Sequence, residues 1–343
     1  MLRKLTVWGL CLFALVAIIG CDGDDNGNGG LNSFNAVLLR PDRLPSLSGG
    51  LVYEGWLARV DDHGNWIEKK SFGKFFWDEF NYKFLASNGS GTQIDSVFEA
   101  KANIYDYDLV AITLEQYPND PSGDPSPTIV AQSTIVPDRV TMMRFPVNFD
   151  GVPPGSFCIG TFSNGNWKEM GEVDKALERY GVWFLSLTVG PTGNEGAEQF
   201  ATALTLPVLP DTGYLYEGWV TTAIGDTIST GKFFFPDYQD YSNRHCDLRA
   251  IPNYPGEDFL VDRPSWIPEA RWPLDCMTGG QALVTVEPNP DNDLQRPSNL
   301  VVLRGNMPAR AADQNGDARR INFPMGSVAG VTFPVIEAVF VKR

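Results

Sequence analysis

The sequence predicts an all-β protein made of two tandem β-sandwich domains that arose by internal duplication. First, runs of β-branched and aromatic residues alternate with turn residues, and the 343 residues include 34 glycines and 25 prolines. Second, the tetrapeptide Tyr-Glu-Gly-Trp occurs twice, at 53–56 and at 216–219. Third, one segment, 166–181, has the pattern of a helix, so a short helical insertion is expected between the two copies.

The first 33 residues have the pattern of an export signal and a tether. Two cations precede an apolar run, 5–20, whose helix would span about 24 Å, less than the ~30 Å core of a bilayer. The run ends in Ile-Ile-Gly-Cys, which resembles the lipobox of bacterial lipoproteins. The resemblance implies cleavage of the signal peptide, 1–20, and acylation of Cys21. The polar, glycine-rich residues 21–33 would then be a flexible tether.

This pattern predicts a protein held at a membrane by its N-terminal lipid. The expected location is the bacterial cell envelope, either at the periplasmic face or at the cell surface. An ordinary signal peptide and an uncleaved anchor are the alternatives.

The match between the two halves extends well beyond the tetrapeptide. Further segments that correspond in the same order are 71–76 and 229–234, 109–137 and 283–308, and 145–162 and 323–340. Matches in one order indicate a duplicated unit of about 140 residues, at 36–187 and 202–343, and not a solenoid of short repeats. The expected domains are 34–187, which includes the helical insertion, and 188–343.

Each of the repeated segments is expected to form strands. Residues 51–60 and 214–222 mix β-branched and aromatic side chains and lead into polar turns. Residues 111–115 and 283–287 alternate in polarity and then stop at Pro and Asp clusters, which cannot continue a strand ladder. Short strands separated by proline-rich turns are typical of β-sandwiches.

The repeated tetrapeptide is predicted to hold strands together. In a strand, Tyr53 and Gly55 share one face, and Glu54 and Trp56 share the other. A hairpin would bring Lys74 near Glu54 and offset the cost of burying its carboxylate. Gly55 has no Cβ and would let an aromatic ring lie across the backbone. The corresponding residues of the second copy are Tyr216, Glu217, Gly218, Trp219 and Lys232.

A functional interpretation of the same motif is the alternative. Glu54 and Glu217 would then be catalytic or would bind a metal ion. The structural interpretation is favoured because the motif lies in the middle of a strand, whereas functional sites gather on loops.

The order of these motifs resembles that in a group of uncharacterised bacterial lipoproteins with duplicated domains of this type. The shared features are Tyr-Glu-Gly-Trp, Ser-x-Gly-Lys-Phe, and an alternating strand that ends in Glu. More distantly, about 90 residues of each repeat resemble the extracytoplasmic domain of anti-sigma-K factors. The resemblance implies a β-sandwich outside the cytoplasm. It does not imply anti-sigma activity, which belongs to a cytoplasmic segment that the resemblance does not include.

Cysteine usage is compatible with export to an oxidising compartment. Cys246 and Cys276 are the expected disulfide pair, because both lie in the loop-rich part of the second repeat. Cys158 lies in an alternating apolar run and is expected to be a small buried side chain. The sequence contains no spacing typical of a zinc site.

Motifs for catalysis are not found. The two histidines, His63 and His245, lie in polar segments and are expected to be exposed loop residues. The sequence has no Ser-His-Asp pattern that can be assembled with confidence, no G-x-S-x-G and no phosphate-binding glycine loop. We therefore expect a protein that is not an enzyme and needs no cofactor. A carbohydrate-active enzyme with paired carboxylates is the remote alternative.

Charge and residue clusters limit the possible partners. A net charge of −15 repels nucleic acid. Asp313, Asn315 and Asp317 alternate as at the start of a calcium loop, but the distal glutamate is missing. Exposed tryptophans could stack on sugar rings; the candidates are Trp66, Trp266 and Trp272. The expected role is a non-enzymatic interaction with an unknown protein or glycan, or support of the envelope. A carbohydrate- or calcium-binding lipoprotein is the alternative.

Overall fold

In this computed structural model of the protein, the described residues are 34–47, 50–120, 123–161, 179–188, 199–210, 213–247, 252–289, 295–309 and 322–343. The expected signal peptide and tether, with Cys21, lie outside them. So do nearly all of the expected helical insertion and the calcium candidates Asp313, Asn315 and Asp317.

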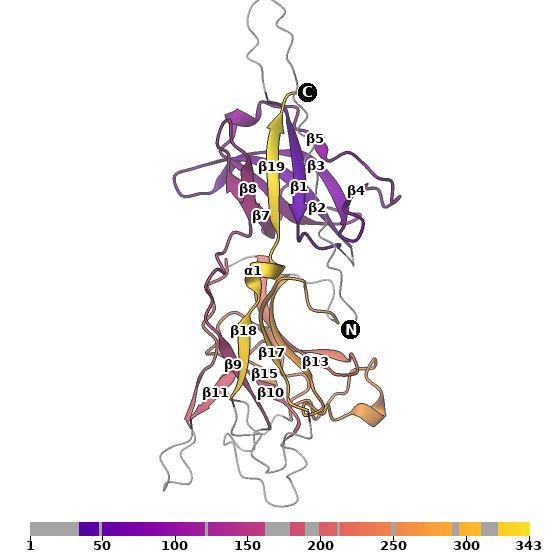
Figure 1. Ribbon diagram of the computed structural model, residues 1–343, viewed down its shortest axis with the longest axis vertical. Helices are drawn as coiled ribbons and strands as arrows, with labels where there is room; N and C mark the ends of the chain where they lie inside the picture. The colour runs from indigo at the N-terminus through magenta and orange to yellow at the C-terminus, as the bar shows by residue number, and fades with distance from the viewer. Residues whose placement is uncertain are drawn as a thin grey trace, which may run out of the picture. The chain divides into compact units, whose positions relative to one another are not determined.

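The described chain is predominantly β (Figure 1). The strands of the first half are β1 (Ala36–Asp42), β2 (Leu51–Val60), β3 (Trp66–Asp78), β4 (Lys83–Ala86), β5 (Val97–Glu99), β6 (Leu109–Gln116), β7 (Ile129–Thr134), β8 (Thr141–Arg144) and β9 (Gly155–Ile159). Those of the second half are β10 (Val182–Trp183), β11 (Leu185–Thr188), β12 (Gln199–Thr202), β13 (Gly213–Thr222), β14 (Thr227–Phe233), β15 (Gly256–Glu257), β16 (Gly280–Asn289), β17 (Val301–Asn306), β18 (Phe323–Ser327) and β19 (Val335–Val341).

Helical structure is minor among the described residues. It consists of one α-helix, α1 (Ala329–Thr332), and the 3₁₀ turns η1 (Ile104–Asp106) and η3 (Glu269–Arg271). In this part of the chain no helix has the length and apolar character needed to cross a bilayer. The all-β prediction is therefore confirmed at the level of secondary structure.

Two large antiparallel sheets contain most of the strands, and their strand orders correspond. The nine-stranded sheet has the order β4-β3-β2-β6-β7-β8-β19-β1-β5, and the eight-stranded sheet has the order β14-β13-β16-β17-β18-β9-β10-β15. From β3 and β14 onward, each strand of one sheet has a counterpart at the same place in the other. Among the described strands, β4 has no counterpart, and β11 and β12 form a separate two-stranded sheet.

Both large sheets cross the expected domain boundary: the nine-stranded sheet includes β19 from the second expected domain, and the eight-stranded sheet includes β9 and β10 from the first. β19, the last strand of the chain, lies between β8 and β1, with Val335 opposite Arg144 (Figure 1). β9 lies between β18 and β10, with Phe157 opposite Phe323. Division of the chain between residues 187 and 188 therefore does not separate the two sheets.

Aromatic packing accompanies the two places where the chain passes from one sheet to the other. Phe145 and Phe149 follow β8, and Phe333 precedes β19. The Phe333 ring centroid lies 5.0 Å from that of Phe145 and 4.6 Å from that of Phe149. All three side chains are buried in the core of the eight-stranded sheet. Their packing against one another fixes the paths by which β9 and β19 reach their sheets.

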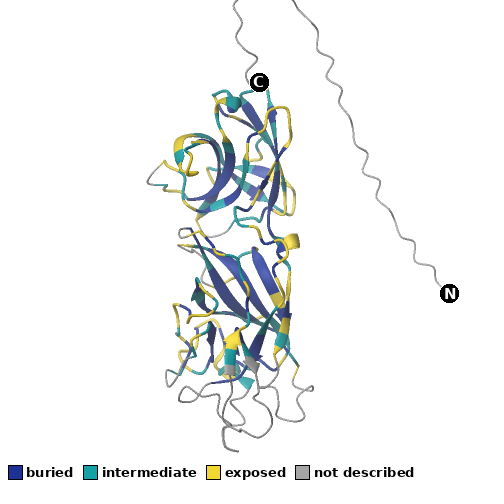
Figure 2. Ribbon diagram, turned by 90° about the vertical axis from the view of Figure 1, so that its left-hand side faces the viewer, coloured by how far each residue is buried: buried dark blue, intermediate teal, exposed yellow. Residues whose placement is uncertain are grey.

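The nine-stranded sheet curves around its own core. Phe98, on edge strand β5, packs against Phe72 and Phe75 of β3, near the opposite edge, with ring centroids 6.1 and 5.2 Å away. The same core contains Ile336 and Ala338 of β19. Figure 2 shows that buried residues follow the strands of both sheets, whereas exposed residues gather in the connecting loops.

Candidate functional site

The first Tyr-Glu-Gly-Trp motif lies in the middle of β2 and places a carboxylate in a buried polar network. Glu54 is 5% exposed and stands opposite Lys74 of β3. Lys74 Nζ lies 3.4 Å from Glu54 Oε2 and 2.7 Å from Asp120 Oδ2. Ser71 Oγ donates a hydrogen bond of 2.5 Å to Glu54 Oε1. The cross-strand lysine thus supplies the charge that a buried carboxylate needs.

The network continues onto β6 through the tryptophan of the motif. Trp56 Nε1 donates to Thr113 Oγ1 at 3.0 Å, and Thr113 Oγ1 donates to Glu115 Oε1. The backbone N–H of Ser126 also donates to Glu115 Oε1, at 2.9 Å. Desolvation by burial raises the pKa of Glu115, although these hydrogen bonds oppose the rise. The motif therefore ties β2, β3 and β6 to the loop that follows β6.

The second motif, on β13, has the same arrangement. Lys232 of β14 stands opposite Glu217, with its Nζ 3.8 Å from Glu217 Oε2. The equivalent hydrogen bonds run from Ser229 to Glu217, from Trp219 to Thr285 at 3.0 Å, from Thr285 to Glu287, and from the Ser298 N–H to Glu287 at 2.9 Å. Two distant parts of the sequence thus form the same network.

The tyrosines of the two motifs face the apolar cores. The Tyr53 ring stacks on Phe75, with centroids 5.6 Å apart, and its hydroxyl donates to the Pro45 carbonyl at 2.8 Å. The Tyr216 ring stacks on Phe233 at 5.7 Å, and its hydroxyl donates to Pro207 at 2.6 Å. Each tyrosine thus fills its core and also satisfies its polar group.

The motif glycines allow close approach of an aromatic ring. A Cβ on Gly55 would collide with the ring of Phe72, which belongs to the adjacent strand β3. A Cβ on Gly218 would collide with the ring of Phe184 and with Thr230 Oγ1. Phe184 lies between β10 and β11 and not in the neighbouring strand β14. The glycine of each motif therefore makes room for an aromatic ring, but the ring comes from a different part of the fold in each case.

In the first network, the charges of the carboxylates are balanced by a lysine, which is typical of a structural role. Oxygen atoms of Glu54, Glu115 and Asp120 lie within 4.8 Å of one another, a separation compatible with metal binding. The Lys74 ammonium, however, already pairs with two of these carboxylates. Two described cavities, of about 400 and 280 Å³, are lined by other residues. This arrangement favours the structural interpretation of Glu54.

A second cluster of acids lies beside β15. Asp240, Glu257 and Asp258 are 5%, 1% and 3% exposed. Asp240 accepts hydrogen bonds from the backbone N–H groups of Ser242 and Gly256, at 3.0 and 2.9 Å. Three carboxyl groups are thus buried together where the loop before β15 meets the strand.

Burial is the main cause of the raised pKa values of these three acids. Desolvation raises the pKa of Asp240 to about 7, that of Glu257 to about 8 and that of Asp258 to about 6. For Glu257, the negative charges of Asp240 and Asp258 add to the rise. These acids hold their protons far more tightly than exposed carboxyls do.

Two expectations about the second repeat are wrong. Cys246 and Cys276 are free thiols and form no disulfide. The reason is that Cys246 packs with Cys158 and Trp183, whereas Cys276 lies in the main core of the eight-stranded sheet. His245 is also buried, at 7% exposure, and its Nδ1 lies 2.9 Å from the Asp262 carbonyl oxygen.

Other sequence expectations have simpler outcomes. His63 is exposed in the turn between β2 and β3, and Cys158 is fully buried in β9. The calcium candidates and the lipidation site lie outside the described residues.

Sequence reasoning missed the polar residues that complete the two networks. The sequence pattern places Glu115 and Glu287 at the ends of strands and does not single out Ser126 or Ser298. In each network the serine follows the glutamate by 11 residues. This equal spacing was the signal that could have revealed the hydrogen bond. The acids of the β15 cluster gave no comparable signal, because Glu257 stands opposite the core residue Val182, whereas the β5 residue opposite the core residue Val37 is the apolar Phe98.

Comparison with known proteins gives no further guide. No family model, curated protein or solved structure matches this chain. The functional interpretation therefore depends on the residues and contacts described above.

Proposed function

We propose that this protein is a lipid-tethered, extracytoplasmic β-protein that binds a partner or supports the cell envelope and catalyses no reaction. The observation that carries the proposal is the environment of Glu54 and Glu217. Both carboxylates are buried, and each is paired with a cross-strand lysine. Carboxylates held in this way support strands and are poorly placed to meet a substrate.

We infer that the two large sheets derive from one duplicated unit of the β-sandwich type, and that the two copies have exchanged their last strands. The corresponding strand orders and the two equivalent glutamate networks support this inference. In the exchange, β9 joins the second sheet and β19 joins the first. In this correspondence β10 matches β1, so the second copy would begin at β10, before residue 188. The nine-stranded sheet would then need both ends of the chain, β1 and β19, whereas all strands of the eight-stranded sheet come from the stretch between β9 and β18.

The tether belongs to the same proposal. Acylation of Cys21 would fix the N-terminus in a bilayer of the bacterial cell envelope, and residues 22–33 would give the β-region its reach. The lipobox resemblance, the short apolar run and the polar linker support this part of the proposal.

Metabolic labelling with radioactive palmitate tests the anchor. The full chain is expected to incorporate label and to partition with membranes, and Cys21→Ala is expected to lose both properties. Cys276→Ala is the matched control because it removes a different cysteine, which is buried in the core. Equal labelling of the wild type and Cys21→Ala would refute the anchor.

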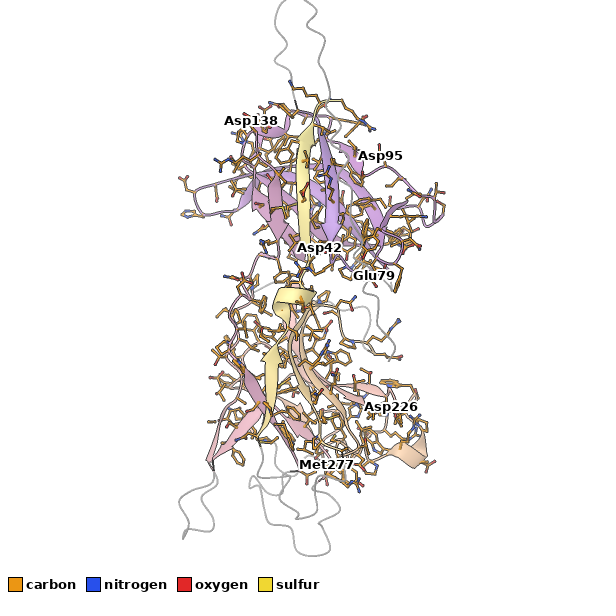
Figure 3. All side chains as sticks on the ribbon, viewed as in Figure 1. Asp42, Glu79, Asp95, Asp138, Asp226 and Met277 are labelled. Atoms are coloured by element: carbon orange, nitrogen blue, oxygen red, sulfur yellow. The ribbon has the colours of Figure 1, made fainter. Side chains whose placement is uncertain are left out.

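Glycan binding is the second candidate function, and one cavity favours it. A cavity of about 400 Å³ is lined by Trp77 and Tyr82 together with polar groups of Arg40, Gln93 and Asp95 (Figure 3 labels Asp95). Tyr82 is 76% exposed. An aromatic ring beside several hydrogen-bonding side chains is the combination that recognises sugars.

Calorimetric titration with a panel of soluble oligosaccharides tests this candidate. Binding is expected to weaken at least about tenfold in Tyr82→Ala, because an exposed stacking surface is lost. Tyr238→Ala, which removes a 59% exposed tyrosine outside this cavity, is the control. No heat with any sugar, or equal binding by Tyr82→Ala, would argue against a glycan site here.

A further inference from the structure

The β15 cluster includes a thiol as well as carboxylates. Ligand atoms of Cys246, Glu257 and Asp258 all lie within 4.8 Å of one another. Their residues are only 2%, 1% and 3% exposed, respectively. Cys246 comes from the loop before β15, Glu257 is the last residue of β15, and Asp258 follows it. Three donors of two chemical kinds therefore converge on one buried point.

This cluster lacks the internal cation that balances the Glu54 network. There, the Lys74 ammonium stands between two carboxylates. Over the described ranges of the chain, no lysine or arginine forms an ion pair with Glu257 or Asp258. The charged groups that act on Glu257 are themselves acids, Asp240 and Asp258. A buried anionic cluster of this kind needs either protons or a bound cation.

One atom of the cluster points to the cation. Glu257 Oε2 is buried and has no hydrogen-bond partner, whereas Oε1 accepts from the His245 N–H at 3.4 Å. The Cys246 thiol lies beside this carboxylate and interacts with it, but a thiol is a weak donor. An orphaned oxygen on a side chain that is 99% buried requires an explanation. A metal ion between the sulfur and this oxygen supplies one.

We propose that Cys246, Glu257 and Asp258 bind one divalent transition-metal ion, and that zinc is the ion this donor set favours. A thiolate with two carboxylates suits zinc, whereas calcium and magnesium take oxygen ligands alone. Bond lengths for zinc place sulfur and oxygen ligands about 3.4–3.6 Å apart in a tetrahedron. The present limit of 4.8 Å can therefore close by side-chain shifts of about 1 Å.

The hydrogen bonds of Asp258 are compatible with this role. Its Oδ1 accepts from the N–H groups of Leu260 and Asp247, at 3.1 and 3.2 Å, and its Oδ2 accepts from the Asp247 N–H at 3.0 Å. Oδ2, which accepts a single one of these bonds, retains a second lone pair for a metal. These bonds hold the carboxylate in place before the ion arrives. The bound ion would fix the Cys246 loop onto β15.

Cobalt(II) replaces zinc in such sites and reports the sulfur ligand directly. Untagged full-length protein, kept reduced and freed of metal with a chelator, is titrated with Co²⁺. The expected result is one equivalent bound with a near-ultraviolet thiolate-to-cobalt charge-transfer band, which Zn²⁺ then abolishes. Zinc is also expected to raise Tm, because it binds the folded state alone. Absence of the thiolate band from the wild type would overturn the proposal.

Three variants locate the site. Cys246→Ser is expected to lose the band, and Glu257→Gln is expected to bind Co²⁺ at least about tenfold more weakly. Glu257→Gln removes a buried charge at nearly constant shape, so it should remain folded and should also lose the zinc-induced rise in Tm. Cys276→Ser removes a buried thiol outside the cluster and should keep both signals. The proposal is wrong if the band survives in Cys246→Ser, or if folded Cys276→Ser loses it.

Discussion

Lys74 Nζ lies 3.4 Å from Glu54 Oε2, between two strands whose register places these residues directly opposite each other. The second motif repeats the relation with Lys232 and Glu217, at 3.8 Å. In each pair the carboxylate is the more deeply buried partner, since the lysine side chains are 30% and 17% exposed and the glutamates 7% and 4%. Loss of the lysine should therefore harm the fold more than loss of the acid.

Lys74→Met is expected to lower the free energy of unfolding by about 3 kcal/mol, because it leaves the Glu54 carboxylate buried without its cation. Glu54→Gln is expected to have a smaller effect, because Lys74 keeps Asp120 at 2.7 Å and part of its hydration. Urea unfolding at pH 7 measures both. The reverse ranking would contradict the structural role assigned to the pair.

A surface pair provides the control for this comparison. Arg59 Nη1 lies 3.3 Å from Glu68 Oε2, and both side chains are more than half exposed. Arg59→Met is therefore expected to change the unfolding free energy by less than about 1 kcal/mol. A loss equal to that of Lys74→Met would mean that burial does not decide the effect.

Gly55→Ala is expected to destabilise the protein by about 1–3 kcal/mol, because the new Cβ would overlap the Phe72 ring. Phe72→Leu added to Gly55→Ala should cost less than the sum of the two single changes, since the leucine leaves room for the methyl group. Thermal unfolding of the three variants gives the coupling. Gly326→Ala, in strand β18 with nothing near its Cβ position, is the control and should have little effect.

The parts of this structure that follow from local sequence could be predicted. The register of Glu54 with Lys74 follows from one hairpin, and the second motif has Glu217 opposite Lys232 in the same way. The faces of Tyr53 and Glu54 follow from the two-residue period of a strand. Burial of Cys158 follows from the apolar pattern around it.

The sheets that β9 and β19 join could not be predicted in this way. Both are short apolar strands, and either has a pattern that fits beside β8 or β18. The choice depends on how Phe145, Phe149 and Phe333 pack where the chain passes between the sheets. Such packing joins residues almost 190 positions apart and has no counterpart in strand periodicity.

The β15 cluster was missed for a related reason. Polar residues around His245 indicated an exposed loop, and burial there comes from tertiary contacts. The backbone N–H groups of Leu260 and Val261 donate to the His245 carbonyl, at 3.0 and 3.2 Å, and fold the loop onto the chain after β15. The polar composition of the segment around His245 cannot indicate such tertiary contacts.

Glu115→Gln is expected to change the pH dependence of stability. Burial raises the pKa of Glu115 in the folded state, so folding favours its protonated form. Wild-type stability should therefore fall as pH rises from the unfolded value, about 4.3, through the raised folded value, and the loss is complete above it. Glutamine removes this titration but keeps an oxygen to accept from Thr113 and Ser126.

Urea unfolding between about pH 4 and pH 8 checks this prediction. The variant should gain stability relative to the wild type as pH rises, and the two should differ least at the acidic end. Glu68→Gln, with a side chain that is 53% exposed, should differ from the wild type by about 0.5 kcal/mol or less throughout. A relative loss of stability by Glu115→Gln at high pH would show that the ionised form is the one that the fold favours.

Ile336→Ala tests whether the end of the chain supports the first sheet. Ile336 is fully buried in the core of that sheet, so its truncation should cost about 2–5 kcal/mol. Hydrogen exchange should quicken mainly in β1 and β8, which flank β19, and less in β13 and β16. Phe157→Ala in β9 is the reciprocal variant and should quicken exchange in β18 and β10. If Ile336→Ala instead loosened the eight-stranded sheet first, β19 would not support the sheet to which its hydrogen bonds assign it.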